Sequence, residues 1–160
     1  MVISDAHKGL VKSIKETFID VSWQRCQVHF LRNILSRIPK KDTKDFREYI
    51  KALFRIQDIK IARVVKEEIY KKYEKEKKYQ ASLNILDEGF EDAFTYLNNE
   101  EIHTRLKSTN CLERLNEEIR RREKVVRIFS NMDSAYRLIG AILMDIDEQW
   151  ISSERIYIKI

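Results

Sequence analysis

The sequence predicts an α/β fold that is strongly rich in helix, and three observations support this prediction. Three glycines and one proline in 160 residues leave little material for hairpin turns. Apolar residues recur at helical spacing from Lys40 to about Asn98, and again near the end of the chain. Two short apolar stretches, Val2-Ile3 and Val21 to Val28, are instead typical of strands.

Residues 1–39 are expected to form the sheet region. Val2-Ile3 has the character of the end of a buried strand, so Asp5 falls at a strand's carboxyl end, where open α/β sheets place their working residues. Two helices are expected around the second strand, and the second of them should stop at Pro39. Their apolar positions are Leu10, Val11, Ile14 and Phe18, and then Leu31, Ile34, Leu35 and Ile38.

Residues 40–107 are expected to be helical throughout. Three apolar groups at helical spacing predict three helices: Phe46, Ile50 and Leu53; Ile61, Val64, Val65 and Ile69; Leu83, Leu86, Phe90 and Leu97.

Residues 108–160 are expected to hold two further helices. The first runs from about Cys111 to Glu123, with a buried stripe of Leu112, Leu115 and Ile119. Val125 to Phe129 is expected to be an extended connection to a final amphipathic helix. That helix carries Ala135, Leu138, Ile139, Ile142, Leu143 and Ile146, and Trp150 closes it.

One face of the helix after Asn110 combines a carboxylate, an amide and a guanidinium. Glu113, Asn116 and Arg120 project together, roughly 90° from the apolar stripe. A carboxylate at a core margin beside strong positive charge suits a divalent metal near a phosphate backbone. The alternative is structural, because Asn110-x-x-Glu113 also has the spacing of a capping box. The residues of this segment alone favour that structural interpretation.

Charge points to an anionic partner. The net charge is +5, and between Arg105 and Arg127 eight Lys and Arg residues stand against four Glu residues. Such a local excess favours nucleic acid over a membrane, although a solvated helix face would also account for it. No apolar run approaches the roughly 18 residues that span a bilayer.

The two cysteines give no disulfide framework, which together with the missing signal peptide predicts a cytoplasmic protein. Cys26-x-x-His29 has the spacing of half a zinc site. No second pair shows such spacing, so we expect no zinc there and instead a buried strand-end cysteine with a hydrogen-bonding histidine.

Three blocks of the sequence together resemble the carboxyl-terminal part of the catalytic domain of Mutator-type transposases of bacterial and archaeal insertion sequences. The blocks are Ser4–Leu10, Trp23–Asn33 and Ser108–Arg122, the last continued by Lys124–Phe129. They follow the family's order, and the resemblance covers about residues 1 to 150.

The resemblance implies a partial ribonuclease-H-like core, interrupted by an all-helical insertion at residues 40–107. Asp5 matches the second aspartate and Glu113 the glutamate of an Asp, Asp, Glu triad that holds Mg²⁺ or Mn²⁺ for DNA strand cleavage and transfer. Cys26 and His29 match a family signature with a structural or DNA-positioning role, and Asn116 is expected near the metal site. The residues expected to hold DNA phosphates are Arg114, Arg120, Arg121, Arg122 and Lys124.

The resemblance also implies that the first catalytic aspartate is absent, so we expect the isolated chain to lack activity. Asp5 and Glu113 are expected within about 10 Å of each other, as a two-metal site requires. The expected partners are DNA, as transposon ends and target, and further copies of the chain or full-length transposase. One rival interpretation is a non-catalytic DNA-binding or regulatory remnant, a partner that joins full-length transposase. The other is a helical interaction protein whose arginines form only a solvated face.

Overall fold

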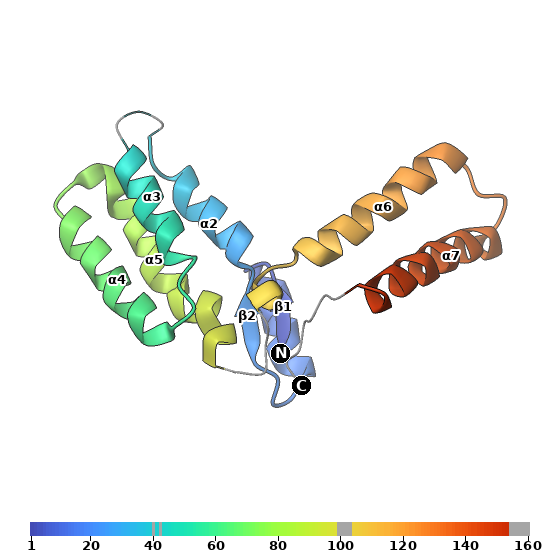
Figure 1. The fold of residues 1–160 in the computed structure, drawn as a ribbon, viewed down its shortest axis with the longest axis horizontal. Helices are drawn as coiled ribbons and strands as arrows, with labels where there is room; N and C mark the ends of the chain where they lie inside the picture. The colour runs from blue at the N-terminus through green and yellow to red at the C-terminus, as the bar shows by residue number, and fades with distance from the viewer. Residues whose placement is uncertain (40, 42, 99–103, 154–160) are drawn as a thin grey trace. The chain divides into compact units, whose positions relative to one another are not determined.

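The computed structural model describes residues 1–39, 41, 43–98 and 104–153, and they fall into two compact units (Figure 1). The first unit is Met1–Thr109, and the second begins at Asn110. The predominance of helix is confirmed, with one small two-stranded sheet among the described residues. None of the helices in these ranges combines the length and the apolar character needed to cross a membrane.

Two short parallel strands open the first unit. Strand β1 (Val2–Ser4) pairs with β2 (Trp23–Arg25), so that Val2 lies opposite Trp23 and Ser4 opposite Arg25. Helix α1 (Lys8–Thr17) connects them, as parallel pairing requires a crossover. The indole Nε1 of Trp23 donates to the buried Ser4 Oγ at 2.9 Å, which ties the strands together through side chains as well.

The predicted second strand is too long at its carboxyl end. Cys26 has an extended backbone at the N-cap of α2 (Gln27–Ser36), so Gln27 and Val28 are helical. The apolar run continues across this boundary because both the strand and the first turn of the helix are partly or fully buried. Periodicity therefore does not mark the place where the strand becomes a helix.

Four helices build the core of the first unit: α2, α3 (Lys44–Leu53), α4 (Ile59–Tyr73) and α5 (Lys77–Phe94). Aromatic side chains fill its centre, and the Phe46 and Tyr79 rings stack at 4.4 Å. Two single-turn 3₁₀ helices, Thr95–Asn98 and Thr104–Lys107, follow. Because α2 packs against α5, this core includes residues on both sides of position 39.

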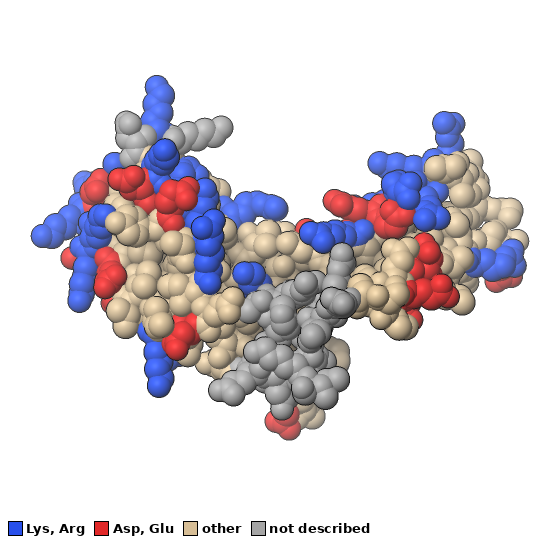
Figure 2. Space-filling model, viewed as in Figure 1, with Lys and Arg blue, Asp and Glu red and all other residues tan. Residues whose placement is uncertain are grey.

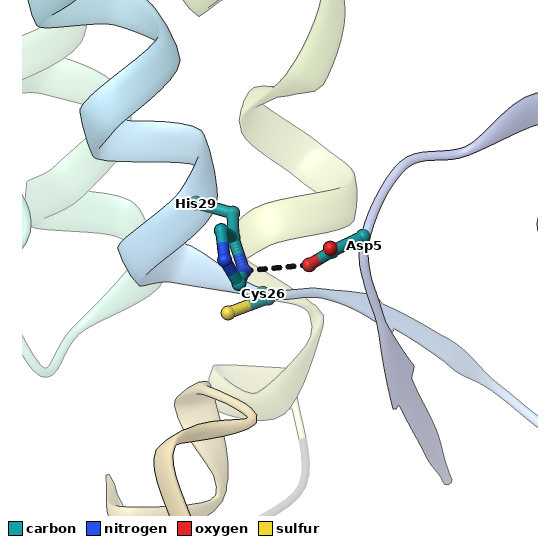
Figure 3. A group of neighbouring side chains, drawn as sticks. All are labelled: Asp5, Cys26 and His29. Atoms are coloured by element: carbon teal, nitrogen blue, oxygen red, sulfur yellow. Dashed lines mark ion pairs between the residues drawn. The ribbon is translucent and has the colours of Figure 1, made fainter. Parts of the chain in front are cut away.

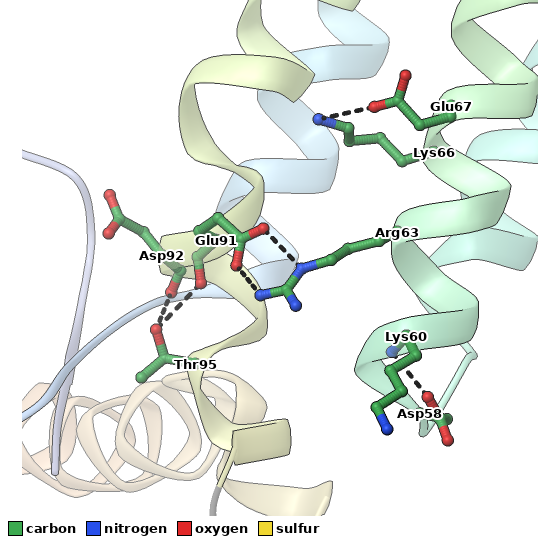
Figure 4. Close-up of polar contacts among 8 residues, drawn as sticks. All are labelled: Asp58, Lys60, Arg63, Lys66, Glu67, Glu91, Asp92 and Thr95. Atoms are coloured by element: carbon green, nitrogen blue, oxygen red, sulfur yellow. Dashed lines mark hydrogen bonds and ion pairs between the residues drawn. The ribbon is translucent and has the colours of Figure 1, made fainter.

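Helix α4 presents a different face to the core than its apolar pattern predicts. Ile61 and Val64 are 55% and 59% exposed, whereas Ala62, Ile69 and Tyr73 are buried. The solvent edge of α4 is fastened to α5 by polar contacts instead (Figure 4). Arg63 makes a two-pronged contact with Glu91, at 3.0 and 2.7 Å, and Lys66 binds Asp87 at 2.7 Å.

Two buried glutamines join the strand pair to the end of α5. The amide nitrogens of Gln24 and Gln27 both donate to the Ala93 carbonyl, at 2.6 and 2.9 Å. The Gln24 side-chain oxygen accepts from the Tyr96 backbone N–H at 2.9 Å. Buried polar groups must find partners, and here the side chains of β2 and α2 bind backbone groups in the last turn of α5 and just beyond it.

The second unit contains α6 (Asn110–Val126) and α7 (Met132–Ile151). The predicted buried stripe on the first of these helices is wrong, because α6 has no buried residue and Leu112 is exposed. Only Ile142 of α7 is buried. Two helices have too little apolar surface to bury a full stripe on each, so most of the pattern stays at partial exposure.

The predicted extended connection at Val125–Phe129 is shorter than expected, because α6 continues through Val126. Arg127 then adopts a left-handed backbone with φ of 62°, and its N–H donates to the Glu123 carbonyl at 2.9 Å. This is the single-bond left-handed ending common at helix C-termini. The turn leads to Asn131, whose side chain caps α7 by accepting from the Ser134 N–H.

Candidate functional site

Asp5 and Cys26 follow the two parallel strands directly, so both lie at the carboxyl end of the strand pair. This is the edge at which open α/β sheets place ligand-binding groups. The predicted position of Asp5 after a strand is confirmed. Its side chain is 53% exposed, and Oδ1 lies 2.6 Å from Nδ1 of His29, which is one turn into α2 (Figure 3).

Cys26 is fully buried beneath this pair. Its Sγ accepts two hydrogen bonds from Thr109, one from the backbone N–H and one from Oγ1, each at 3.4 Å. Cys26 therefore anchors the segment that precedes α6 to the end of β2. The structural role of the cysteine stays a prediction.

One ligand atom from each of Asp5, Cys26 and His29 lies within 4.8 Å of the other two. Sequence spacing reveals two of these groups, and the fold adds the third. A closed structural zinc site has four ligands, and this is the one group of three or more potential ligands among the described residues. Magnesium takes oxygen ligands, so of the three only the Asp5 carboxylate suits it, and its other ligands would come from outside the group.

A hollow of about 240 Å³ opens beside this group. Its polar lining consists of Asp5, His7, Arg25, His29 and Asn33. A second hollow of about 510 Å³ lies along α1, and Arg25 lines this one too. Its other charged lining residues are Lys8, Lys12, Lys15, Glu16 and Asp92. Over the two hollows together, four Lys and Arg side chains stand against the three carboxylates of Asp5, Glu16 and Asp92, a small positive excess that suits an anionic ligand.

Arg25 and the three lysines of α1 were not predicted as functional residues. Their grouping depends on the strand register and on the helix that crosses between the strands, which no local spacing encodes. One signal was available, because Gly89 is one of three glycines and lies inside a helical pattern. An isolated helical glycine often marks a close approach, and Gly89 approaches Arg25.

Glu113 lies in the first turn of α6 and is partly exposed. Asn110 is the first residue of the helix, and Asn116 is exposed on its second turn. Asp5 and Glu113 belong to different compact units. The approach of their carboxylates to each other therefore stays a prediction.

The predicted DNA-binding residues of α6 differ in their partners. Glu118 binds Arg121 through both carboxylate oxygens, at 2.9 and 2.7 Å, and Arg122 at 3.0 Å. Arg122 also lies 3.8 Å from Asp145 of α7. In contrast, no ion pair within the described ranges uses Arg114, Arg120 or Lys124. Figure 2 shows this mixture of both signs over α6.

The two arginine contacts change the acidity of Glu118. Hydrogen bonds from Arg121 and Arg122 lower the pKa of this exposed carboxyl from its ordinary value to about 2. Glu118 is therefore ionised at neutral pH and neutralises part of the arginine block. Arg120 is left as the member of the block whose charge is not matched by a bound carboxylate.

The sequence of the chain matches a known protein family. A model described as "Transposase, Mutator family" matches residues 1–153. The chain belongs to the Mutator family of transposases.

Individual relatives are transposases of bacterial insertion sequences. The chain is 57% identical over 159 residues to the transposase for insertion sequence element IS256 in transposon Tn4001 of Staphylococcus aureus, which covers 99% of the chain and 41% of that relative. It is 39% identical to the ISRM5 transposase of Rhizobium meliloti, covering 97% and 39%. It is 33% identical to the IS1081 transposase of Mycobacterium tuberculosis, covering 97% and 37%. The chain thus spans about two fifths of the length of these relatives.

Proposed function

We propose that this chain supplies part of the catalytic centre of a DNA transposase that cleaves and joins DNA strands with Mg²⁺ or Mn²⁺. The observation that carries the proposal is the place of Asp5, exposed at the carboxyl end of a parallel strand pair beside a hollow that Arg25, His7 and His29 also line. On this proposal the pair β1 and β2 belongs to a ribonuclease-H-like sheet, and residues 40–107 are its helical insertion.

Asp5 and Glu113 are the proposed metal ligands. A divalent ion held by carboxylates activates an attacking oxygen and stabilises the leaving oxygen of a phosphodiester. The Asp5 oxygen that faces His29 is held at 2.6 Å, which fixes the orientation of the carboxylate and leaves Oδ2 for a cation. In this proposal His29 is a positioning residue, and Asn116 supports Glu113 from the next turn of α6.

Phosphates of the transposon ends and the target are the proposed ligands of the basic residues of α6. Arg114, Arg120 and Lys124 are exposed and carry no carboxylate partner within the described part of the chain. Arg121 and Arg122 must first share or release Glu118 before they can bind phosphate. Further copies of the transposase are the proposed protein partners.

A chimaera with a relative tests the catalytic proposal. Residues 1–160 would replace the matching segment of the 57% identical IS256 transposase, and excision of a marked element from a plasmid would be counted in cells. The chimaera should excise the element, and Asp5→Asn or Glu113→Gln should each abolish excision. Glu117→Gln, on the same helix as Glu113, is the matched control and should retain it. Excision that survives both substitutions would refute the assignment of the two carboxylates.

A second candidate function is DNA binding without strand cleavage. The observation that favours it is the exposure on α6 of Arg114, Arg120 and Lys124, which form no ion pair within the described ranges and whose binding to phosphate does not depend on a metal. A chimaera with Asp5→Asn separates the two functions, because a binding role survives that substitution and a cleavage role does not. If the Asp5→Asn chimaera excises nothing itself but still changes how often a co-expressed intact transposase excises the element, the second candidate is favoured.

A further inference from the structure

Arg25 is held in an unusual setting at the end of β2. The central carbon of its guanidinium lies 4.3 Å from the centre of the Phe30 ring, a distance at which a cation and a ring attract. The guanidinium also lies close to the backbone of α5 at Gly89. A Cβ atom at position 89 would overlap Arg25 Nη1 and would lie 2.6 Å from Phe30 Cε2. The guanidinium therefore occupies a place that the Phe30 ring borders and that a side chain at position 89 would fill.

Apart from its contact with the Phe30 ring, this guanidinium binds no acceptor within the described part of the chain. It takes part in none of the hydrogen bonds and none of the ion pairs among the described residues. Burial lowers the pKa of Arg25 from its ordinary value, and the charges of Asp92 and Glu88 offset only part of this effect. A guanidinium carries five N–H donors, and a partly buried one without an acceptor retains most of its capacity for a ligand.

Arg25 lines both hollows of the first unit. On one side the polar lining includes Asp5, His7 and His29. On the other side it includes Lys8, Lys12 and Lys15, which follow one another at spacings of four and three residues along α1. Such spacing places the three ammonium groups along one face of the helix. Arg25 is the cation that these two hollows share.

We propose that Arg25 is a phosphate-binding residue that fixes a nucleic-acid backbone across the wall between the two hollows, with one phosphate beside Asp5 and the next phosphates along α1. The phosphate beside Asp5 accepts from the guanidinium in the two-pronged geometry that arginine offers to phosphate. Lys8 and Lys15 neutralise the strand as it leaves, whereas Lys12 lies 3.7 Å from the Glu16 carboxylate. This inference rests on the proposed function, because that function makes nucleic acid the source of the phosphates.

Duplex binding of the full chain tests this role. Affinity for a fluorescent duplex would be measured over a range of salt concentrations for the unmodified chain, Arg25→Gln and the control Arg63→Gln. Arg63 is on the same unit, and Glu91 already occupies it. Arg25→Gln should weaken binding roughly tenfold at low salt and lower the salt slope by about 0.9. Arg63→Gln should leave both values near those of the unmodified chain, and equal effects of the two substitutions would overturn the proposal.

Gly89→Ala offers a variant that keeps the charge. The added methyl group must displace the guanidinium or the Phe30 ring, so it should weaken duplex binding without altering the composition of the basic surface. Gly140→Ala is its control, because a Cβ atom at Gly140 meets nothing within 4 Å. Circular dichroism of each variant establishes that folded protein is compared.

A small probe separates failure of Arg25 from failure of the DNA function. Pyrophosphate at millimolar concentration should raise the unfolding temperature of the unmodified chain and of Arg63→Gln, and should do so much less for Arg25→Gln. If the chain binds no duplex but shows this pattern, the anion site stands and the DNA function falls. If Arg25→Gln binds duplex as tightly as the unmodified chain, or gains as much from pyrophosphate, the anion site falls.

Discussion

The Asp5 carboxylate and the His29 imidazole lie 2.6 Å apart at the end of the strand pair, and each is the polar partner of the other. The two atoms lie at ion-pair distance, so the contact brings the end of β1 and the first turn of α2 together. The histidine of a Cys-x-x-His spacing that suggests zinc is thus directed to a carboxylate 24 residues earlier in the chain. The contact therefore pairs two of the three groups that could bind zinc at this place.

We predict that the purified chain holds no tightly bound zinc. Asp5 and His29 already lie at ion-pair distance from each other, and Cys26 Sγ already accepts two hydrogen bonds from Thr109. The described residues therefore offer three ligand groups here for a shell that needs four. Elemental analysis after dialysis against a chelator-free buffer measures this. One zinc per chain that disappears in Cys26→Ala but persists in Cys111→Ala would contradict the prediction.

We predict that Gln24→Leu destabilises the first unit by about 1–3 kcal/mol. The substitution keeps the side-chain volume but leaves the Tyr96 N–H without its acceptor in a buried place, and such a donor carries its full desolvation cost. Urea unfolding followed by tryptophan fluorescence measures the loss. Ser36→Ala removes an exposed hydrogen bond and should change stability by less than about 0.5 kcal/mol. A similar small change for Gln24→Leu would show that the buried amide is dispensable.

We predict that substitutions of Arg120 and Arg122 on α6 affect different properties of the chain. Arg120→Ala should weaken duplex binding and flatten the salt slope by roughly one unit, because no bound carboxylate neutralises Arg120 within the described residues. Arg122→Ala should mainly lower thermal stability, because Arg122 binds Glu118 and lies near Asp145 of α7. Anisotropy titrations and thermal melts of both variants provide the two measurements. Equal effects on both would indicate a diffuse basic surface.

We predict that the Glu118 ion pairs persist well below the ordinary titration range of a glutamate. The pKa of Glu118 in the folded chain, about 2, lies below the ordinary value of 4.5. The contribution of this carboxyl to the stability of the folded state is therefore complete above pH 4.5 and is lost as the pH falls toward 2. A ¹³C NMR titration of the Glu118 carboxyl group measures this directly. Arg121→Gln should move the midpoint upward, whereas a midpoint near 4.5 in the unmodified chain would mean that the pairs do not form in solution.

The sequence predicts the elements of this fold best where the apolar positions of an element are also the residues that the fold buries. The strand ending before Asp5 is observed, and so are the helices at Phe46–Leu53 and at Leu83–Phe90. Helix α4 is also observed, but its buried side is misjudged, because Ile61 and Val64 face solvent. Periodicity detects a helix, whereas the choice of its buried face is made by the neighbours against which it packs.

The candidate site is predictable only in part for a related reason. Asp5, Cys26 and His29 are visible as residue types in suggestive spacings, and the position of Asp5 is confirmed. The pairing of Asp5 with His29, and the place of Arg25 between two hollows, depend on strand register and on an approach to α5 that spans more than 60 residues of sequence. Contacts of that range leave no local pattern except the glycine that permits them.

The long-range bonds at the end of β2 also determine when the site can form. The hydrogen bond of Cys26 joins it to Thr109, 83 residues later, and that of Gln24 joins it to Ala93, 69 residues later. Closing such loops costs chain entropy before any contact repays it, so the neighbouring helices α3, α4 and α5 can associate first. During synthesis, which proceeds from the amino terminus, Asp5 and His29 exist long before the residues that fix their surroundings have been made. The candidate site is therefore completed late in folding, although Asp5 and His29 are synthesised before the residues that fix their surroundings.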